Sequence, residues 1–113
     1  METWKDIPKY EGIYLVSSLG RVKSLRCGRE KILKQSVNAK DKKKCLSLYD
    51  SGKNITYETH RLVAEVFVPN PKRNPQVFHK NRNKNDNRAE NLEWVEYNYE
   101  KYKNQSLNVS LSQ

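Results

Sequence analysis

The segment from Val77 to Glu100 contains the residues whose types and spacing could carry chemistry. It begins with a short apolar run that ends on His79 and continues with eleven residues crowded with Asn, Lys and Arg. An imidazole titrates at about pH 6.5, so His79 could act as a neutral general base at working pH. Hydrolysis of a phosphodiester needs such a base, together with positive charge at the phosphate and at the leaving 3′ oxygen.

The local pattern predicts the elements that would position His79. Val77–His79 and Leu92–Val95 have the character of short strands, and Glu96–Lys103 that of a helix, whereas Lys80–Glu90 is too polar for a core. This order would place His79 at the edge of a small hairpin, facing the helix. It corresponds to the ββα-metal arrangement, in which one histidine and one cation act on a phosphodiester.

The spacing resembles that of the HNH homing endonucleases found in phages and their introns. The residues that match the pattern H-x-x-x-N-x-x-x-N-x-x-x-N-L-x-W are His79, Asn83, Asn87, Asn91, Leu92 and Trp94. Upstream, residues 60–71 resemble the segment that precedes this motif in the family. Residues 4–24 resemble the small nuclease-associated DNA-binding module that is often fused to it, so the resemblance covers about residues 4–100.

The resemblance implies a role for three positions. His79 takes the position of the general base, and Asn91 that of the residue that braces the loop and helps to orient the base. Glu100 takes the third motif position, and a carboxylate is a competent ligand for Mg²⁺. We therefore expect Mg²⁺ or Mn²⁺ as the cofactor of an active enzyme, held by Glu100, water and the DNA phosphate.

Three positions depart from the family pattern. Phe78 precedes the base, where the family usually has a metal ligand, and a phenyl ring cannot coordinate a hard cation. Glu100 replaces the usual Asn or His. Arg82 stands where Gly is frequent, and a positive φ there would strain the chain by about 1 kcal/mol. His79 could therefore also be an inherited histidine in a scaffold that only binds DNA.

The charge is strongly positive and unevenly distributed. The formal net charge is +9, and between Arg21 and Lys84 the sequence has 17 Lys and Arg against five acidic residues. Such a surface attracts nucleic acid, although a solubilising lysine coat would give the same composition. The cations expected to hold the DNA backbone are Arg21, Lys23, Arg26, Lys42, Lys43, Lys44, Arg82 and Lys84.

The N-terminal half is predicted to be rich in short strands. Residues 13–16 form an apolar strand, residues 17–20 a turn, and residues 21–25 an alternating strand with Val22 inward and Arg21 and Lys23 outward. The run at residues 40–44 is either a solvated loop or a finger that tracks the DNA backbone.

A hairpin and a helix follow. Strands at residues 46–49 and 55–57 would flank a five-residue loop, Asp50–Asn54. The helix is expected over His60–Val68, with Thr59 as N-cap and Pro69 as its stop. His60 is interpreted as a structural residue rather than a catalyst.

The chain is expected to be an α+β protein. Residues 1–50 would be the N-terminal DNA-binding β module, residues 51–103 the helix and the ββα-metal unit, and residues 104–113 a polar tail. No apolar run approaches the ~20 residues of a membrane span, so we expect a cytoplasmic protein, in the host cytoplasm if a phage encodes it. Cys27 and Cys45 lack the spacing of a zinc site.

Three functions remain open at this point. The first is an HNH-type DNA endonuclease that nicks double-stranded DNA with a metal ion. The second is a catalytically inactive DNA-binding protein on the same fold. The third is a phage regulator that uses its basic face to bind an acidic host or competitor protein. DNA is the expected partner in the first two cases, and no membrane is expected in any of them.

Overall fold

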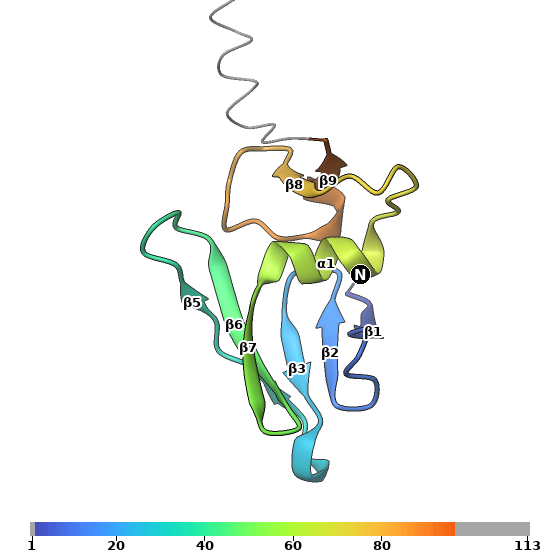
Figure 1. Cartoon of the computed structure of the whole chain (residues 1–113), viewed down its shortest axis with the longest axis vertical. Helices are drawn as coiled ribbons and strands as arrows, with labels where there is room; N and C mark the ends of the chain where they lie inside the picture. The colour runs from blue at the N-terminus through green and yellow to red at the C-terminus, as the bar shows by residue number, and fades with distance from the viewer. Residues whose placement is uncertain (1, 97–113) are drawn as a thin grey trace, which may run out of the picture.

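The computed structural model describes residues 2–96, which form three antiparallel sheets around one α-helix (Figure 1). The first sheet contains β1 (Trp4–Asp6), β2 (Tyr14–Ser17), β3 (Val22–Ser24) and β4 (Lys31–Ile32) in that order. The second contains β5 (Ser36–Val37), β6 (Lys44–Asp50) and β7 (Lys53–Glu58). The remaining elements are α1 (Thr59–Phe67), the hairpin of β8 (Gln76–His79) and β9 (Leu92–Val95), and the 3₁₀ turns η1 (Arg26–Gly28) and η2 (Ala89–Asn91).

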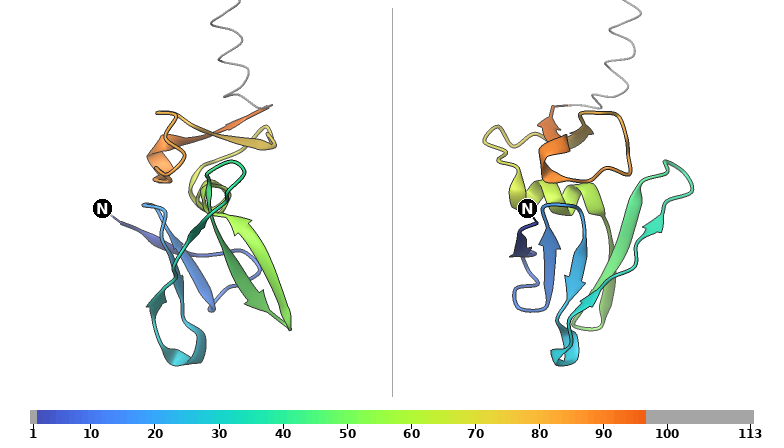
Figure 2. Two further views of the ribbon diagram at one scale, coloured as in Figure 1. Left: turned by 90° about the vertical axis from the view of Figure 1, so that its left-hand side faces the viewer. Right: turned by 180° about the vertical axis from the view of Figure 1, so that it is seen from behind.

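Helix α1 is the central element of this arrangement. It lies between the β8–β9 hairpin on one side and the two larger sheets on the other, and it contacts all three sheets (Figure 2). Leu62, Val63 and Ala64 are buried on it, and Val66 and Phe67 are partly buried against the same core. The helix ends at Phe67, and the N–H of Val68 closes the last turn on the carbonyl of Ala64 at 3.0 Å.

One hydrophobic core joins the N-terminal strands to the hairpin. Its members are Ile7, Tyr10, Tyr14, Val16, Val22, Leu46, Leu48, Leu62, Val63, Ala64, Val77 and Leu92. Residues from the first sheet, the second sheet, the helix and the β8–β9 hairpin thus share a single cluster. The predicted α+β fold, with a small β module followed by a helix and a hairpin, is confirmed.

The predicted five-residue loop at Asp50–Asn54 is wrong. Asp50 pairs with Lys53 and Tyr49 with Asn54, so only Ser51 and Gly52 form the turn. Both have positive φ, 51° and 81°, which is the geometry that matches the twist of flanking strands in two-residue hairpins. Polar flanking residues hid the strand ends from the sequence pattern, because backbone pairing needs no apolar side chain.

Thr59 is not the N-cap of the helix. It is the first helical residue, and Glu58 takes the N-cap position without a side-chain hydrogen bond to the helix. The Thr59 hydroxyl is fully buried and donates instead to Oε1 of Gln35 at 2.8 Å. A partner 24 residues away therefore takes the hydroxyl that the local pattern assigned to the cap.

The predicted helix at Glu96–Lys103 and the tail at residues 104–113 lie outside the described residues, apart from Glu96. The division into residues 1–50, 51–103 and 104–113 stays a prediction, and its first boundary falls in the β6–β7 turn. Within residues 2–96, no helix has the length and apolar character needed to cross a membrane.

Candidate functional site

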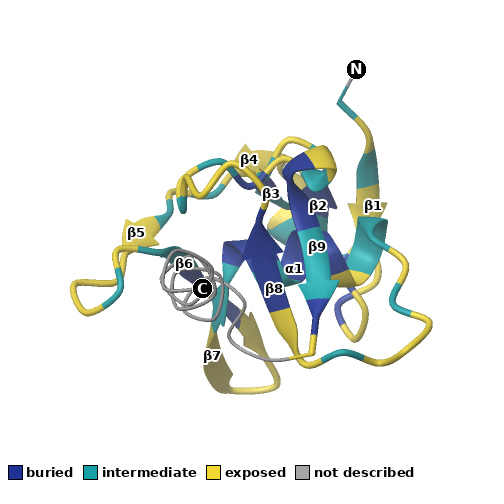
Figure 3. Ribbon diagram, turned by 90° about the horizontal axis from the view of Figure 1, so that it is seen from above, coloured by how far each residue is buried: buried dark blue, intermediate teal, exposed yellow. Residues whose placement is uncertain are grey.

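His79 lies at the end of β8, and its side chain is held by an asparagine. The strand is buried along most of its length when the molecule is seen from above (Figure 3), and His79 itself is 0% exposed. Its Nε2 lies 2.7 Å from Oδ1 of Asn87, which is also buried. An amide oxygen only accepts, so Nε2 carries the proton and the basic lone pair lies on Nδ1. The hydrogen bond to Asn87 thus fixes the orientation of the ring.

A second imidazole packs against His79 from helix α1. The ring centroids of His60 and His79 are 5.1 Å apart at an angle of 45°. Burial, and next the neighbouring His79, lower the pKa of His60 to about 3. His60 is therefore neutral at neutral pH and adds no charge beside His79, in keeping with its interpretation as a structural residue.

Asn91 ties the two ends of the β8–β9 loop together. Its Nδ2 donates to Oδ1 of Asn81 at 2.9 Å and to the carbonyl of Asp86 at 2.8 Å. Its Oδ1 accepts the N–H of Asn81 at 3.1 Å, and its own carbonyl accepts the N–H of Lys80 at 2.7 Å. These four bonds brace the loop that carries Asn87, and so they hold the partner of His79 in place.

Further polar side chains fix the path of the same loop. Oδ1 of Asn81 accepts the N–H of Asn83 at 2.9 Å, and Oδ1 of Asn83 accepts the N–H of Asn85 at 3.0 Å, which are the bonds of Asx turns. The Arg88 guanidinium pairs with Asp86 at 2.8 Å and holds the pKa of that carboxyl well below its usual range. The abundance of Asn in this segment thus reflects local backbone capping.

Arg82 adopts the conformation for which glycine is best suited. Its φ is 62°, so the loop position does require the left-handed conformation, and the condition for backbone strain at Arg82 is met. The Arg82 N–H donates to the carbonyl of His79 at 2.9 Å, which closes a tight turn directly after β8.

The described residues alone do not make up a divalent-cation site. Among residues 2–96, no group of three His, Cys, Asp or Glu side chains lies close enough together to hold a metal ion. Phe78, beside His79 in the chain, is buried with 3% of its surface exposed and offers no oxygen ligand. Glu100, the predicted ligand, lies outside the described residues.

Two of the predicted DNA-binding cations meet on the ring of Trp4. The Lys23 ammonium lies 4.2 Å from the ring centroid and the Arg21 guanidinium 5.5 Å, so both point away from Val22, as the alternation predicts. Each is also paired with a carboxylate. Nε of Arg21 donates to Glu2 at 2.8 Å, and this contact lowers the pKa of Glu2 to about 2. Lys23 pairs with Glu30 at 3.4 Å.

Arg26 lies far from this cluster, in η1, and is engaged with tyrosines. Its Nε donates to the hydroxyl of Tyr14 at 2.9 Å, and it also hydrogen-bonds to the carbonyl of Tyr49. The guanidinium lies over both rings, at 5.4 and 5.0 Å from their centroids. These contacts fasten η1 to β6, a structural role that the sequence did not indicate.

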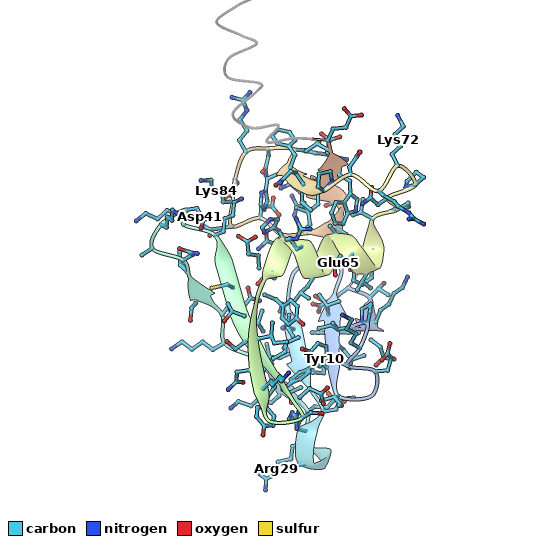
Figure 4. All side chains as sticks on the ribbon, in the orientation of Figure 1. Tyr10, Arg29, Asp41, Glu65, Lys72 and Lys84 are labelled. Carbon is cyan, nitrogen blue, oxygen red and sulfur yellow. The ribbon has the colours of Figure 1, made fainter. Side chains whose placement is uncertain are left out.

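The basic segment Lys42–Lys44 lies beside the β8–β9 loop. Nζ of Lys84 donates to the carbonyl of Asp41 at 3.1 Å, and Figure 4 shows the two residues side by side. The structure thereby brings Lys42–Lys44 and Lys84 to one end of the molecule. Figure 4 labels Arg29 at the other end of the molecule, and Arg29 directly follows η1, to which Arg26 belongs.

Asn87 belongs to the sequence motif, but the motif alone did not indicate a function for it. Its position in the regular Asn spacing was the only available signal, because the contact with His79 spans a loop whose path is set by Asn91 and Asp86. The predicted site residues His79 and Asn91 are thus close together in the structure, with Asn87 as the missing member of the group.

Known families match this chain over most of its length. A NUMOD4 motif matches residues 2–49, and an HNH endonuclease model matches residues 57–99. The chain is 41% identical to the DNA endonuclease I-HmuI of Bacillus phage SP01 over 113 residues, which covers 97% of this chain and 63% of the relative. It is 34% identical to the H-N-H endonuclease F-TflII of Escherichia phage T5 over 94 residues, covering 81% of this chain and 47% of the relative.

A solved structure supports the same relationship. The structure described as "DNA binding and cleavage by the HNH homing endonuclease I-HmuI" superposes with a TM-score of 0.81 at 39% sequence identity. The match covers 94% of this chain and 59% of that one, so the present chain spans less than two thirds of its relatives. The two family models, the phage relatives and this structural match agree with one another: the chain belongs to the HNH homing endonucleases and carries a NUMOD4 motif before its HNH region.

Proposed function

We propose that this chain is an HNH-type endonuclease that nicks double-stranded DNA. The observation that carries the proposal is the His79–Asn87 pair at the end of β8, in which the amide oxygen selects the tautomer with a basic Nδ1. The related phage endonucleases, and the DNA binding and cleavage described for the structural neighbour, support DNA as the substrate.

Each residue of the pair has a defined task in this reaction. His79 would take the proton of the attacking water on Nδ1, while Asn87 holds the Nε2–H and fixes the plane of the ring. Asn91 acts through the loop and holds Asn87 at its distance. Because His79 is 0% exposed, the residues that cover its ring must move before water and phosphate can reach it.

We further propose that cleavage uses Mg²⁺ or Mn²⁺, with Glu100 as the acidic ligand of the chain. Such a cation would supply positive charge at the phosphate. Lys42, Lys43, Lys44, Lys84 and Arg82 would contact the DNA backbone near His79, and Arg21, Lys23 and Arg26 would contact it elsewhere. The phage origin of two relatives supports the host cytoplasm as the compartment.

Nicking of supercoiled plasmid with Mg²⁺ or Mn²⁺ tests this proposal. The native chain should convert plasmid to the open circular form, and His79→Ala should lose at least ~100-fold in rate, as expected for loss of a general base. The matched control is Asn85→Ala, an exposed residue of the same loop, which leaves the proposed base and both neighbours of its ring unchanged. Equal rates for the native chain and His79→Ala would overturn the assignment of the base.

A second candidate is a DNA-binding protein without nuclease activity. The specific observation in its favour is Phe78, a buried phenyl ring at the position of a metal ligand, next to a base that is itself buried. The variant Phe78→Asp separates the two candidates. Cleavage by this variant, but not by the native chain, would show that the scaffold binds DNA and lost its metal site at this position.

A further inference from the structure

The turn at residues 17–20 of the NUMOD4 motif lies directly against Asn87. Gly20 has φ +91°, and a Cβ on it would come within 3.0 Å of Cβ and 3.1 Å of the carbonyl oxygen of Asn87. These distances are tighter than nine in ten real Cβ contacts, and L side chains rarely adopt this φ, so any other residue at position 20 would be strained and would push against Asn87. The contact fixes the backbone of the residue whose side chain holds His79.

A backbone hydrogen bond secures the same junction two residues further on. The N–H of Ala89 donates to the carbonyl of Ser18 at 2.8 Å. The turn and residues 87–89 therefore touch at two points, one by close packing and one by a hydrogen bond. Contacts at two points restrict rotation of the loop as well as its distance from the turn.

A second route leads from Gly20 to His79 through helix α1. Nε2 of Gln35 donates to the carbonyl of Gly20 at 2.9 Å, and its Oε1 accepts the hydroxyl of Thr59 at 2.8 Å. Thr59 begins α1 and precedes His60, whose ring packs on His79. Both neighbours of the His79 ring, Asn87 and His60, are thus connected to the same turn.

We infer that the turn at residues 17–20 positions the His79 imidazole, with Gly20 as the positioning residue that sets the distance. The N-terminal module is then one wall of the HNH site in addition to any contact it makes with DNA. The catalytic consequence of this inference rests on the proposed nuclease function. The positioning itself does not, because it concerns contacts within the chain.

The test compares Gly20→Ala with Gly12→Ala by NMR of the imidazole nitrogens. Both glycines have positive φ, +91° and +78°, so both variants carry similar backbone strain, but a Cβ on Gly12 meets nothing within 4 Å. The chain has two histidines, so His79→Ala assigns the signals. We expect the His79 Nε2–H resonance to shift or broaden in Gly20→Ala and to stay in place in Gly12→Ala. An unchanged resonance in folded Gly20→Ala would overturn the inference.

Gln35→Ala keeps the inference testable if Gly20→Ala does not fold. It removes both bonds of the second route without backbone strain, and we expect a smaller displacement of the His60 and His79 signals. No displacement would refute that route. In plasmid nicking, Gly20→Ala should lower kcat roughly 10- to 100-fold with little change in KM, as expected for a misplaced base. If the native chain does not cleave, the proposed function fails, and the NMR result still decides the inference.

Discussion

The sheet of the N-terminal module and the loop between β8 and β9 are held in place by different forces. In the sheet, Val16 and Val22 are completely buried and pack into the common core. In the loop, most side chains are exposed, and Asn81, Asn91 and Asp86 fix the path of the backbone through directed hydrogen bonds. Both regions meet at the junction of Gly20 and Asn87.

The comparison shows that the core supplies most of the stability, whereas the hydrogen bonds of the loop determine its geometry. Apolar burial is non-directional and contributes free energy in proportion to the area removed from water. Amide hydrogen bonds each add only ~1 kcal/mol net, but they fix angles and distances. The loop that carries Asn87 therefore gains precision from its asparagines, while the sheets and helix supply the core that keeps the loop folded.

The largest effect on stability is expected from a substitution that creates a cavity in the core beside the sheets. Leu48 on β6 is 0% exposed, and Leu48→Ala should lower the free energy of unfolding by about 2–5 kcal/mol. Urea denaturation followed by circular dichroism measures this loss. The exposed Leu19→Ala is the matched control, with an expected change below ~0.5 kcal/mol. Equal losses at both positions would contradict the assignment of stability to the core.

The loop should respond to loss of a hydrogen-bonding residue. Asn91→Ala removes three side-chain hydrogen bonds, and we expect a loss of about 2–4 kcal/mol in the free energy of unfolding. The His79 imidazole signals should move as well, because the loop carries Asn87. Asn85→Ala, at an exposed position in the same loop, serves as control. A stable Asn91→Ala variant with unchanged signals would show that the loop is held by other contacts.

Acid should destabilise the fold through His60, which packs on His79. The pKa of His60 is lowered from 6.5 to about 3, so the unfolded chain binds a proton before the folded chain does as the pH falls. His60 therefore contributes its full stability above pH 6.5 and loses it between pH 6.5 and about 3, by up to ~1.4 kcal/mol per pH unit. The groups that act on it are His79, Lys43, Arg61 and Asp41.

Unfolding free energies at several pH values check this slope. The range between pH 6.5 and 5 is most informative, because Glu2, with its pKa lowered from 4.5 to about 2, loses its contribution only in more acidic solution. The variant His60→Gln should flatten the profile in the upper range. A profile that keeps its slope without His60 would assign the acid sensitivity to another group.

A smaller effect is expected at Arg82. Its φ of 62° favours glycine, so Arg82→Gly should raise the free energy of unfolding by at most about 1 kcal/mol. Arg88→Gly is the contrasting variant, since Arg88 has an ordinary φ of −65° and would lose its ion pair with Asp86. Thermal unfolding measures the stability of both variants. A less stable Arg82→Gly variant would show that the positive φ of Arg82 does not strain the backbone.

The smallest effect concerns the cations of the N-terminal module. Glu2→Gln should free the Arg21 guanidinium for phosphate and tighten binding to duplex DNA roughly two- to fivefold at low salt. Glu11→Gln changes the net charge equally but affects a carboxylate that accepts a backbone N–H from Lys9. Equal gains for both variants would show that only net charge matters.

The sequence predicts best what depends on neighbours in the chain. The strands around His79 and the turn after β2 follow from short patterns and are confirmed, and the resemblance to the family drew attention to Arg82, whose φ is positive. The contact of Arg26 with Tyr49 and that of Gly20 with Asn87 join residues 23 and 67 positions apart, so no local pattern could indicate them. Thr59 is another example, because its hydroxyl donates to the distant Gln35 and does not cap the helix.

Burial of His79 has a consequence for affinity. Under the proposed function, the groups packed on the buried ring would have to move before DNA could reach it, so a productive complex would form from a less populated, open conformation. Part of the interaction free energy with DNA would then be used for this opening, and the affinity would be weaker than the contacts alone would give. A substitution that uncovers His79 should therefore tighten DNA binding without adding a single contact to the phosphates.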